Sequence, residues 1–221
     1  MRTTWRRVVK TEPLIFLLTV ILSFTCLTDN SFGYSESDLQ KLLSTKECVG
    51  CDLSGADLSG LDLREADLTK ANLSKADLTK AKLITTNLTK AKLTQAKLTQ
   101  AKLRKANLSK ADLTEANLTE ANLTGADLRE ADLTEANLTE ADLTKAKLIT
   151  ADLTRANLTE ADLQGANLTK ADLTRAHLTK ANLKGADLRE ADLTEANLTE
   201  ANLTKAKLKG ANLKNTKGMH F

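Results

Sequence analysis

Two cysteines three residues apart are the residues of this sequence best suited to chemistry. Cys48 and Cys51 form the motif CVGC, whose spacing suits a disulfide, half of a zinc site or a redox pair. A zinc site would need ligands from a second chain, because no His lies near the motif. A thioredoxin-like redox motif needs a strand followed by a helix, and no such context follows Cys51. We therefore expect a structural disulfide between Cys48 and Cys51, no metal and no cofactor.

The N-terminal segment indicates export, which suits a disulfide. Basic residues precede an apolar run at 14–27. This length is typical of a secretory signal and short for a membrane-spanning helix. We interpret residues 1–33 as a signal peptide, and the alternative is a membrane anchor formed by residues 14–27. Cleavage would remove Cys26 and leave one cysteine pair in an oxidising compartment, where disulfides form. We expect a periplasmic or secreted protein.

The remaining sequence offers little for catalysis or for nucleic-acid binding. The whole chain contains two His residues, and its formal net charge is +3. No Ser-His-Asp order, phosphate-binding loop or metal-ligand cluster is present. We expect no catalytic residue and no enzymatic activity, and the small net charge gives no indication of a nucleic-acid partner.

A five-residue repeat decides the fold class. Residues 51–215 divide into 33 pentads, since 165 residues divided by five leave no remainder. The third position is always Leu, and the first is Ala in 30 of 33, the exceptions being Cys51, Leu61 and Thr86. On a helix successive Leu would rotate by about 140°, and in a strand an odd period would send them to opposite faces. The pattern predicts a solenoid that turns at each pentad and points Leu and Ala toward one axis.

Pentads such as ADLTE, ANLTE and AKLIT make the sequence resemble the pentapeptide-repeat family. The segment LLSTKECVGCDLSGADLSG is similar to exported cyanobacterial members, which would place the protein in the thylakoid lumen or the periplasm. The resemblance implies an all-β solenoid, a right-handed quadrilateral β-helix with four pentads per coil. The 33 pentads then form about eight coils, a rod roughly 40 Å long.

Both ends of such a β-helix need covers, because they expose unpaired backbone and apolar interior. We predict a short N-terminal α-helical cap and linker at residues 34–50, with Ser37 as N-cap and Gln40 completing a capping box. The disulfide would fasten this cap. Residues 216–221 form a short C-terminal tail, and the family resemblance implies a homodimer through this end.

Four pentads per coil place residues twenty apart in one outward column. One column is acidic and could bind a cation or a basic partner. Alternatively, each Asp simply bonds its own turn. The candidate interaction column consists of Asp112, Asp132, Asp152, Asp172 and Asp192. His177 replaces an Asn in the adjacent column, and we interpret it as a solvated substitution.

Charge is banded along the predicted rod. Residues 66–110 contain eleven basic and two acidic residues, whereas residues 111–145 contain two basic and nine acidic residues. Such banding could orient association or attract an anionic surface. Duplication of pentads is the alternative explanation, since residues 126–150 and 186–210 are near copies. The candidate basic band is represented by Lys82, Lys92, Lys97 and Lys102.

These features favour a non-catalytic structural or protein-interaction module that acts outside the cytoplasm with a protein partner. The family resemblance supplies an alternative, a DNA mimic that binds a type II topoisomerase. That role requires a long acidic surface and a cytoplasmic location, whereas the acidic band here adjoins a basic one. We expect membrane contact only if residues 14–27 remain as an anchor.

Overall fold

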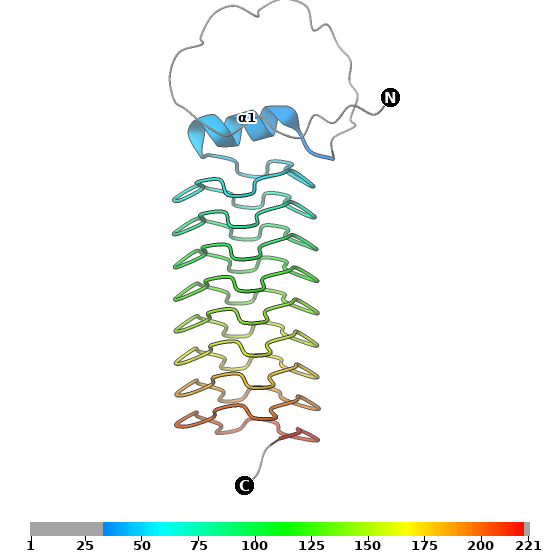
Figure 1. The fold of residues 1–221 in the computed structure, drawn as a ribbon, viewed down its shortest axis with the longest axis vertical. Helices are drawn as coiled ribbons and strands as arrows, with labels where there is room; N and C mark the ends of the chain where they lie inside the picture. The colour runs from blue at the N-terminus through cyan, green and yellow to red at the C-terminus, as the bar shows by residue number, and fades with distance from the viewer. Residues whose placement is uncertain (1–32, 219–221) are drawn as a thin grey trace, which may run out of the picture.

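The computed structural model describes residues 33–218, which form one helix followed by a stack of coils (Figure 1). The predicted signal peptide, except for Gly33, lies outside the described residues, as do residues 219–221 of the predicted tail. Within residues 33–218, no helix is long and apolar enough to cross a membrane.

Each pentad forms one side of a coil through a fixed set of backbone hydrogen bonds. In the pentad 116–120, the N–H of Asn117 donates to the preceding coil at 2.9 Å. The N–H groups of Leu118 and Glu120 donate to the following coil at 2.7 and 2.9 Å. The N–H of Ala121 then closes a turn on the carbonyl of Leu118 at 3.0 Å. Stacking therefore supplies the hydrogen bonds that no pentad could form alone.

The β-structure of residues 33–218 consists of isolated parallel bridges between second-position residues twenty apart. These bridges run from the pair Glu47 and Asp67 to the pair Asn197 and Lys217, and they confirm four pentads per coil. The pairing reaches into residues 46–50, predicted as linker, and into the predicted tail. Cys48 takes the place of Leu there and is fully buried, so the solenoid begins one pentad before Cys51.

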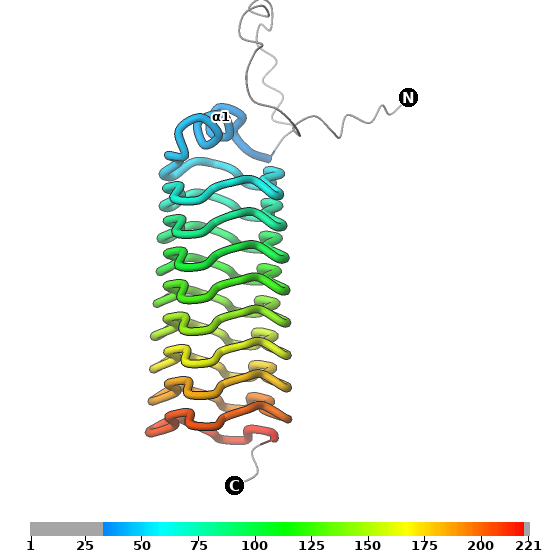
Figure 2. The backbone as a smooth tube through the Cα atoms, turned by 60° about the vertical axis from the view of Figure 1, so that its left-hand side comes forward, coloured from blue at the N-terminus to red at the C-terminus, as the bar shows by residue number. Residues whose placement is uncertain are grey.

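The corners of the coils lie at the fifth positions, where the backbone is left-handed. Non-glycine residues at these corners have φ between 55° and 63°, as at Glu120 and Lys205. This conformation strains L-residues and suits glycine, yet most corners carry long polar side chains. The corners stack in straight columns along the solenoid (Figure 2).

The core is aliphatic and continuous along the axis. Third-position leucines from Leu53 to Leu198 are at most 2% exposed. Thr86 is also fully buried, and its hydroxyl donates to the carbonyl of Leu63 at 2.6 Å. Leu61 is partly buried against the same cluster. The two irregular first positions are thus accommodated within the solenoid wall.

Helix α1, Glu36–Thr45, lies across the N-terminal end of the stack (Figure 1). Its N-cap is Ser35, whose hydroxyl accepts the N–H of Asp38 at 3.3 Å. The prediction of Ser37 as N-cap was wrong, because the helix begins at Glu36. Gln40 does not close a capping box either, since its amide donates to a carboxylate one turn earlier at 3.0 Å.

One side of α1 packs on the solenoid. Leu42 is fully buried in the same cluster as the core leucines, and Leu39 is partly buried against it. Leu43 remains 48% exposed. The helix therefore covers apolar surface of the first coil mainly through Leu42.

Candidate interaction surfaces

The structure brings the five aspartates of the candidate interaction column together on one face, each bridged to the next. One carboxylate oxygen of each Asp accepts the N–H of the Thr two residues later, at 2.8 to 3.0 Å. The donors are Thr114, Thr134, Thr154, Thr174 and Thr194. Each Asp thus fixes its own turn. No group of three or more His, Cys, Asp and Glu side chains in the described part of the chain could hold a metal ion.

Hydrogen bonds hold the two ends of this column in the charged form. Burial acts to raise the pKa of Asp112, but hydrogen bonds from Thr114 and Thr94 outweigh it, so this pKa lies below its usual value. At the other end, the hydroxyl and amide of Thr194 lower the pKa of Asp192. Both carboxylates are therefore ionised at neutral pH.

Arginines at neighbouring corners interrupt the negative charge beside this column. Arg155 Nη1 lies 3.2 Å from Glu135 Oε1. Arg175 Nε lies 2.7 Å from Glu195 Oε2. These ion pairs place two guanidinium groups beside the stacked aspartates, so the face carries both signs of charge.

His177 lies in the adjacent column, between Asn157 and Asn197. Its side chain is exposed. A shallow hollow of about 430 Å³ is lined by Glu135, Arg155, Arg175 and His177. The sequence carries a signal for this grouping, which the interpretation of His177 as a solvated substitution missed: Arg175 precedes it by two residues, and Arg155 lies one coil before Arg175.

The four lysines of the basic band are all exposed. Lys92, Lys97 and Lys102 occupy successive second positions, so they lie on three sides of one coil, and Lys82 stacks on Lys102. Only Lys97 among them has an ion-pair partner among the described residues, Asp77 at 4.0 Å. The band is thus a collar of largely unpaired ammonium groups.

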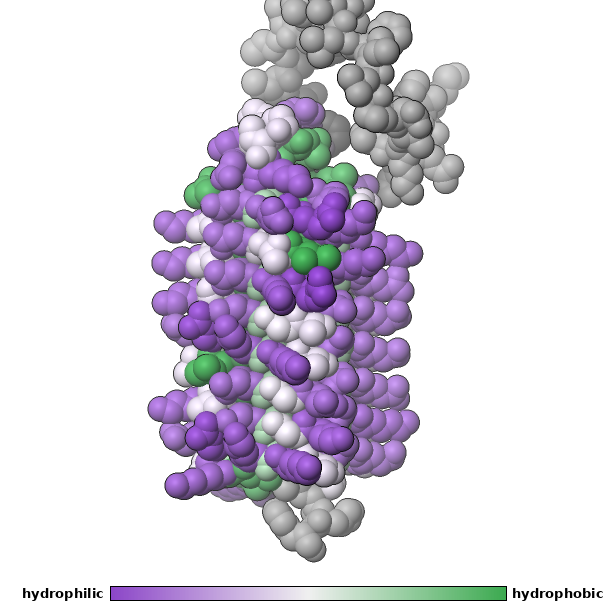
Figure 3. All heavy atoms as spheres, turned by 90° about the vertical axis from the view of Figure 1, so that its left-hand side faces the viewer, coloured by the Kyte–Doolittle hydropathy of each residue, from purple (hydrophilic) through white to green (hydrophobic). Residues whose placement is uncertain are grey.

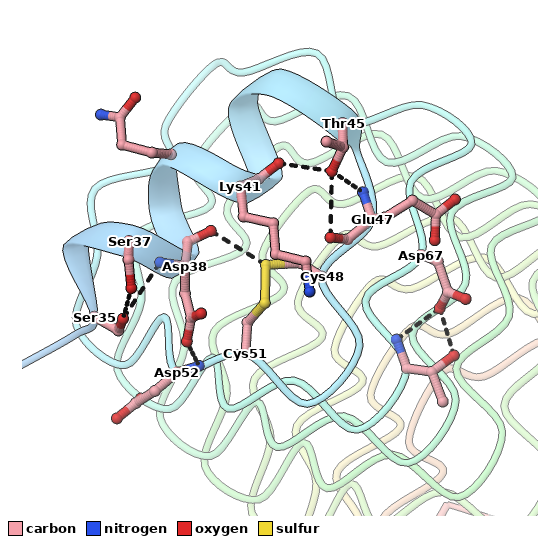
Figure 4. The surroundings of a disulfide bond; sticks show 12 residues. Ser35, Ser37, Asp38, Lys41, Thr45, Glu47, Cys48, Cys51, Asp52 and Asp67 are labelled. Carbon is pink, nitrogen blue, oxygen red and sulfur yellow. Dashed lines mark hydrogen bonds between the residues drawn. A yellow bond between two sulfur atoms is a disulfide. The ribbon is translucent and has the colours of Figure 1, made fainter.

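The Cys48–Cys51 disulfide joins two neighbouring inward positions at the start of the solenoid, with a Cα–Cα distance of 5.3 Å (Figure 4). Cys48 is fully buried, and Cys51 is 4% exposed. The carbonyl oxygen of Asp38 lies 3.2 Å from Cys48 Sγ. The disulfide therefore lies directly beneath α1.

The C-terminal end is less covered. Leu203, Leu208 and Leu213 are only partly buried. A hollow of about 570 Å³ is lined in part by Ala201, Leu203 and Leu208. No later coil within the described residues provides carbonyl partners for the N–H groups of Leu203 and Leu208. Met219 and Phe221, considered above as part of the tail, lie outside the described residues.

Comparisons with known proteins agree with this architecture. A family model described as pentapeptide repeats matches in eight copies, which together fall within residues 47–84, 81–119, 116–155, 156–194 and 181–217. The solved structure of HetL, a pentapeptide repeat protein involved in heterocyst differentiation regulation from the cyanobacterium Nostoc sp. strain PCC 7120, is 40% identical. The match covers 79% of this chain and 87% of HetL, with a TM-score of 0.63. This similarity shows the right-handed quadrilateral β-helix that the resemblance implied.

Two further solved structures are more distant. Rfr23 from the cyanobacterium Cyanothece 51142 is 26% identical, covering 83% of this chain and 98% of Rfr23, with a TM-score of 0.43. QnrB1, a plasmid-mediated fluoroquinolone resistance protein, is 20% identical, covering 68% of this chain and 82% of QnrB1, with a TM-score of 0.49. No curated protein matches the sequence.

Proposed function

The chain belongs to the pentapeptide-repeat family, and on that premise we propose that it is a non-catalytic module for protein interaction or structural support. The observation that carries this proposal is the regular outward surface. Second-position and corner side chains are presented at a spacing of about 4.8 Å along the rod, and the face seen in Figure 3 is predominantly hydrophilic. Such a surface can bind a partner by matching charge over several coils.

We propose that the partner is a protein and that the basic band, Lys82, Lys92, Lys97 and Lys102, is the surface that binds it. All four lysines are exposed, and only Lys97 has an internal ion pair, at 4.0 Å, so the band is available to an acidic partner. HetL is described as involved in the regulation of differentiation, which suits a protein that acts by binding.

Export remains part of the proposal. Residues 1–33 would direct the chain to the periplasm, the thylakoid lumen or the medium, with residues 14–27 as a membrane anchor if cleavage does not occur. The disulfide supports this location, because such bonds persist in oxidising compartments. Cell fractionation tests it, and full-length protein found exclusively in the cytoplasm would contradict it.

A DNA mimic that binds a type II topoisomerase is the second candidate. The five stacked aspartates favour it, since they form a linear acidic array. Arg155 and Arg175 beside that array count against it. Inhibition of gyrase supercoiling by the purified protein, lost when Asp132, Asp152 and Asp172 are changed to Asn, would favour this candidate over the first.

Affinity capture tests the proposed interaction role. The bait is the tagged protein, with extracellular and periplasmic extracts as the source of partners. A partner should be lost when the four lysines of the basic band are changed to Glu. The matched control changes four lysines at the C-terminal end to Glu, namely Lys205, Lys207, Lys209 and Lys214, and should retain that partner. Equal capture by both variants would overturn the assignment of the basic band.

A further inference from the structure

On one side of the solenoid, the charges follow an order along the axis that is complementary to the same side of a second, antiparallel copy. It is the side whose second-position residues include Lys97 and Asn117, and two corner columns border it. The first column holds Lys75, Gln95, Glu115 and Glu135, and the second holds Lys80, Gln100, Glu120 and Glu140. Both columns change from basic to acidic over four consecutive coils. We call this side the antisymmetric face.

The internal contacts of the antisymmetric face leave its outer charges available. In the middle of each column, the Gln side-chain amide donates to the Glu of the following coil, at 2.7 Å in both cases. Lys75, Lys80 and Glu140 have no ion-pair partner among the described residues, and all three side chains are exposed. Glu135 contacts Arg155 at 3.2 Å and keeps 43% of its side chain exposed. The columns are therefore basic at one end and acidic at the other, and an uncharged Gln separates the Lys from the first Glu.

We propose that two copies of this chain associate side by side and antiparallel through the antisymmetric face. A two-fold axis in the plane of the contact, perpendicular to the solenoid, sets each column against the same column of the second copy in reverse order. Lys75 then faces Glu135 of the second copy, and Lys80 faces Glu140. Symmetry makes each of these pairs twice.

The remaining positions on this side fit the same arrangement. The reversal places Lys97 opposite Asn117, and Asp77 opposite Asn137, and an amide can accept from ammonium or donate to carboxylate. One coil before Lys75 and Lys80, the two columns carry Gly55 and Gly60. These glycines would lie opposite Arg155 and Glu160 of the second copy. No like charges meet over about six coils of overlap, roughly 29 Å.

The opposite side of the solenoid lacks this symmetry. One of its corner columns carries Lys105 and Lys145 on either side of Gly125, so reversal would bring like charges together. The other has three consecutive lysines, Lys70, Lys90 and Lys110, before Glu130. Of these two opposite sides, only the antisymmetric face is complementary to itself on reversal.

Exposed ion pairs are individually weak and are screened by salt. The association should therefore be reversible and should weaken steeply between about 0.01 M and 1 M salt, where the Debye length falls from ~30 Å to ~3 Å. Sedimentation equilibrium of the protein at both salt concentrations measures this dependence. A monomer at low salt, at protein concentrations up to about 1 mM, would overturn the proposal.

Charge reversal provides the sharper test. The variant K75E/K80E and the variant E135K/E140K should each be monomeric, because each sets like charges opposite one another. An equimolar mixture of the two should associate again, because every reversed corner then meets an opposite charge. The quadruple variant should self-associate as the unmodified protein does. Both charge types already occupy corners elsewhere in the solenoid, so the variants preserve the fold, which circular dichroism checks.

The control variant K70E/K90E has the same change in net charge on the opposite side and should associate normally. Small-angle scattering separates this contact from pairing through the C-terminal ends, because the lateral pair is about two coils longer than one copy, whereas the end-to-end pair is twice as long. Failure of the mixture to reassociate, or a doubled length, would overturn the proposal. The inference rests on the proposed interaction role but is tested apart from it, since capture of another protein by the basic band does not require self-association.

Discussion

Asp38 Oδ2 accepts the backbone N–H of Asp52 at 2.8 Å and so takes the place of a carbonyl from a preceding coil. One coil later, the equivalent N–H of Asn72 donates to the carbonyl of Cys51, also at 2.8 Å. The N–H of Ser35 completes the substitution by donating to the carbonyl of Asp52 at 2.9 Å. Helix α1 therefore continues the hydrogen-bond pattern of the solenoid at its first edge, with a side chain in place of backbone.

Asp38→Ala should loosen this edge, because the N–H of Asp52 would lose its acceptor. We expect a loss of about 1 kcal/mol in the free energy of unfolding, since the bond is partly solvent-exposed. Urea denaturation measures the loss, and hydrogen exchange should show faster exchange of the Asp52 amide. Asp38→Asn retains an oxygen acceptor and should lose less. Equal effects of the two substitutions would contradict this role of the carboxylate.

Removing the disulfide should destabilise the N-terminal coil before the rest of the solenoid. The double variant C48L/C51A tests this, because Leu and Ala are the usual residues at these two positions. The bond closes a very short loop, so its entropic contribution is about 2 kcal/mol. Hydrogen exchange should accelerate in α1 and the first coil while the middle coils stay protected. A uniform acceleration along the chain would argue against a local role.

Burial along the core predicts a position-dependent cost of truncating leucine. Leu118→Ala should cost about 2 to 5 kcal/mol, because Leu118 is fully buried between coils. Leu208→Ala should cost less than about 2 kcal/mol, because Leu208 is only partly buried. Urea titrations of the two variants provide the comparison. Similar losses would mean that the C-terminal coil is covered in solution.

Thr150→Gly should stabilise the protein by up to about 1 kcal/mol. Thr150 is β-branched and has φ of 55°, a conformation that costs an L-residue roughly 1 to 2 kcal/mol. Glycine removes that strain, but the greater conformational entropy of the unfolded chain offsets about 0.4 to 1 kcal/mol of the gain in stability. Glu120→Gly, at an unbranched corner with the same φ, should gain less. Thermal unfolding of both variants tests the order, and a destabilised Thr150→Gly protein would refute it.

Asp62 should contribute to the loss of stability in acid. The Arg64 side chain, which donates from Nε at 2.8 Å, lowers the pKa of Asp62 from 3.8 to about 2. A carboxyl whose pKa is lower in the folded state stabilises the protein above its unfolded pKa and loses that contribution as pH falls through the folded pKa. The contribution is therefore present above about pH 4 and disappears toward pH 2.

Comparison of stability against pH isolates this contribution from those of other carboxylates. Asp62→Asn should flatten the dependence of unfolding free energy on pH between about pH 4 and pH 2. Arg64→Leu should flatten it less, because it removes the guanidinium but keeps the backbone N–H at this position, which donates to Asp62 Oδ1 at 3.3 Å. An NMR titration in which Asp62 titrates near 3.8 in the folded protein would contradict the expected shift.

The period of the sequence was sufficient to predict the solenoid, whereas the family resemblance supplied the four pentads per coil that define its columns. Leu at the third position of every pentad determines which side of the backbone faces the axis. Four pentads per coil then stack Asp112 on Asp132. Once the number of pentads per coil is known, both properties follow from spacing along the chain. Partners of the corner side chains could not be predicted in this way. Arg155 pairs with Glu135 rather than with Asp152, because the choice depends on side-chain conformation.

The N-terminal end was predicted less well for a related reason. Ser35 and Ser37 both suit an N-cap, and the actual choice of Ser35 sets Asp38 where its carboxylate reaches Asp52. This long-range contact leaves no local signal in the sequence. The pentad 46–50 was also missed, because Lys46 and Cys48 replace the usual Ala and Leu, although the backbone pairs as in later coils.

Because one coil contains twenty residues, the core and the outward surface tolerate different insertions and deletions. Inserting a single pentad would leave every Leu in the core but turn all downstream outward residues by one side, so that Asp152 would no longer stack on Asp132. Only gains or losses of whole coils preserve the outward columns. The near copies at 126–150 and 186–210 are sixty residues apart, which is three whole coils. Length can therefore change by small steps without unfolding the rod, whereas its charge pattern survives only steps of twenty.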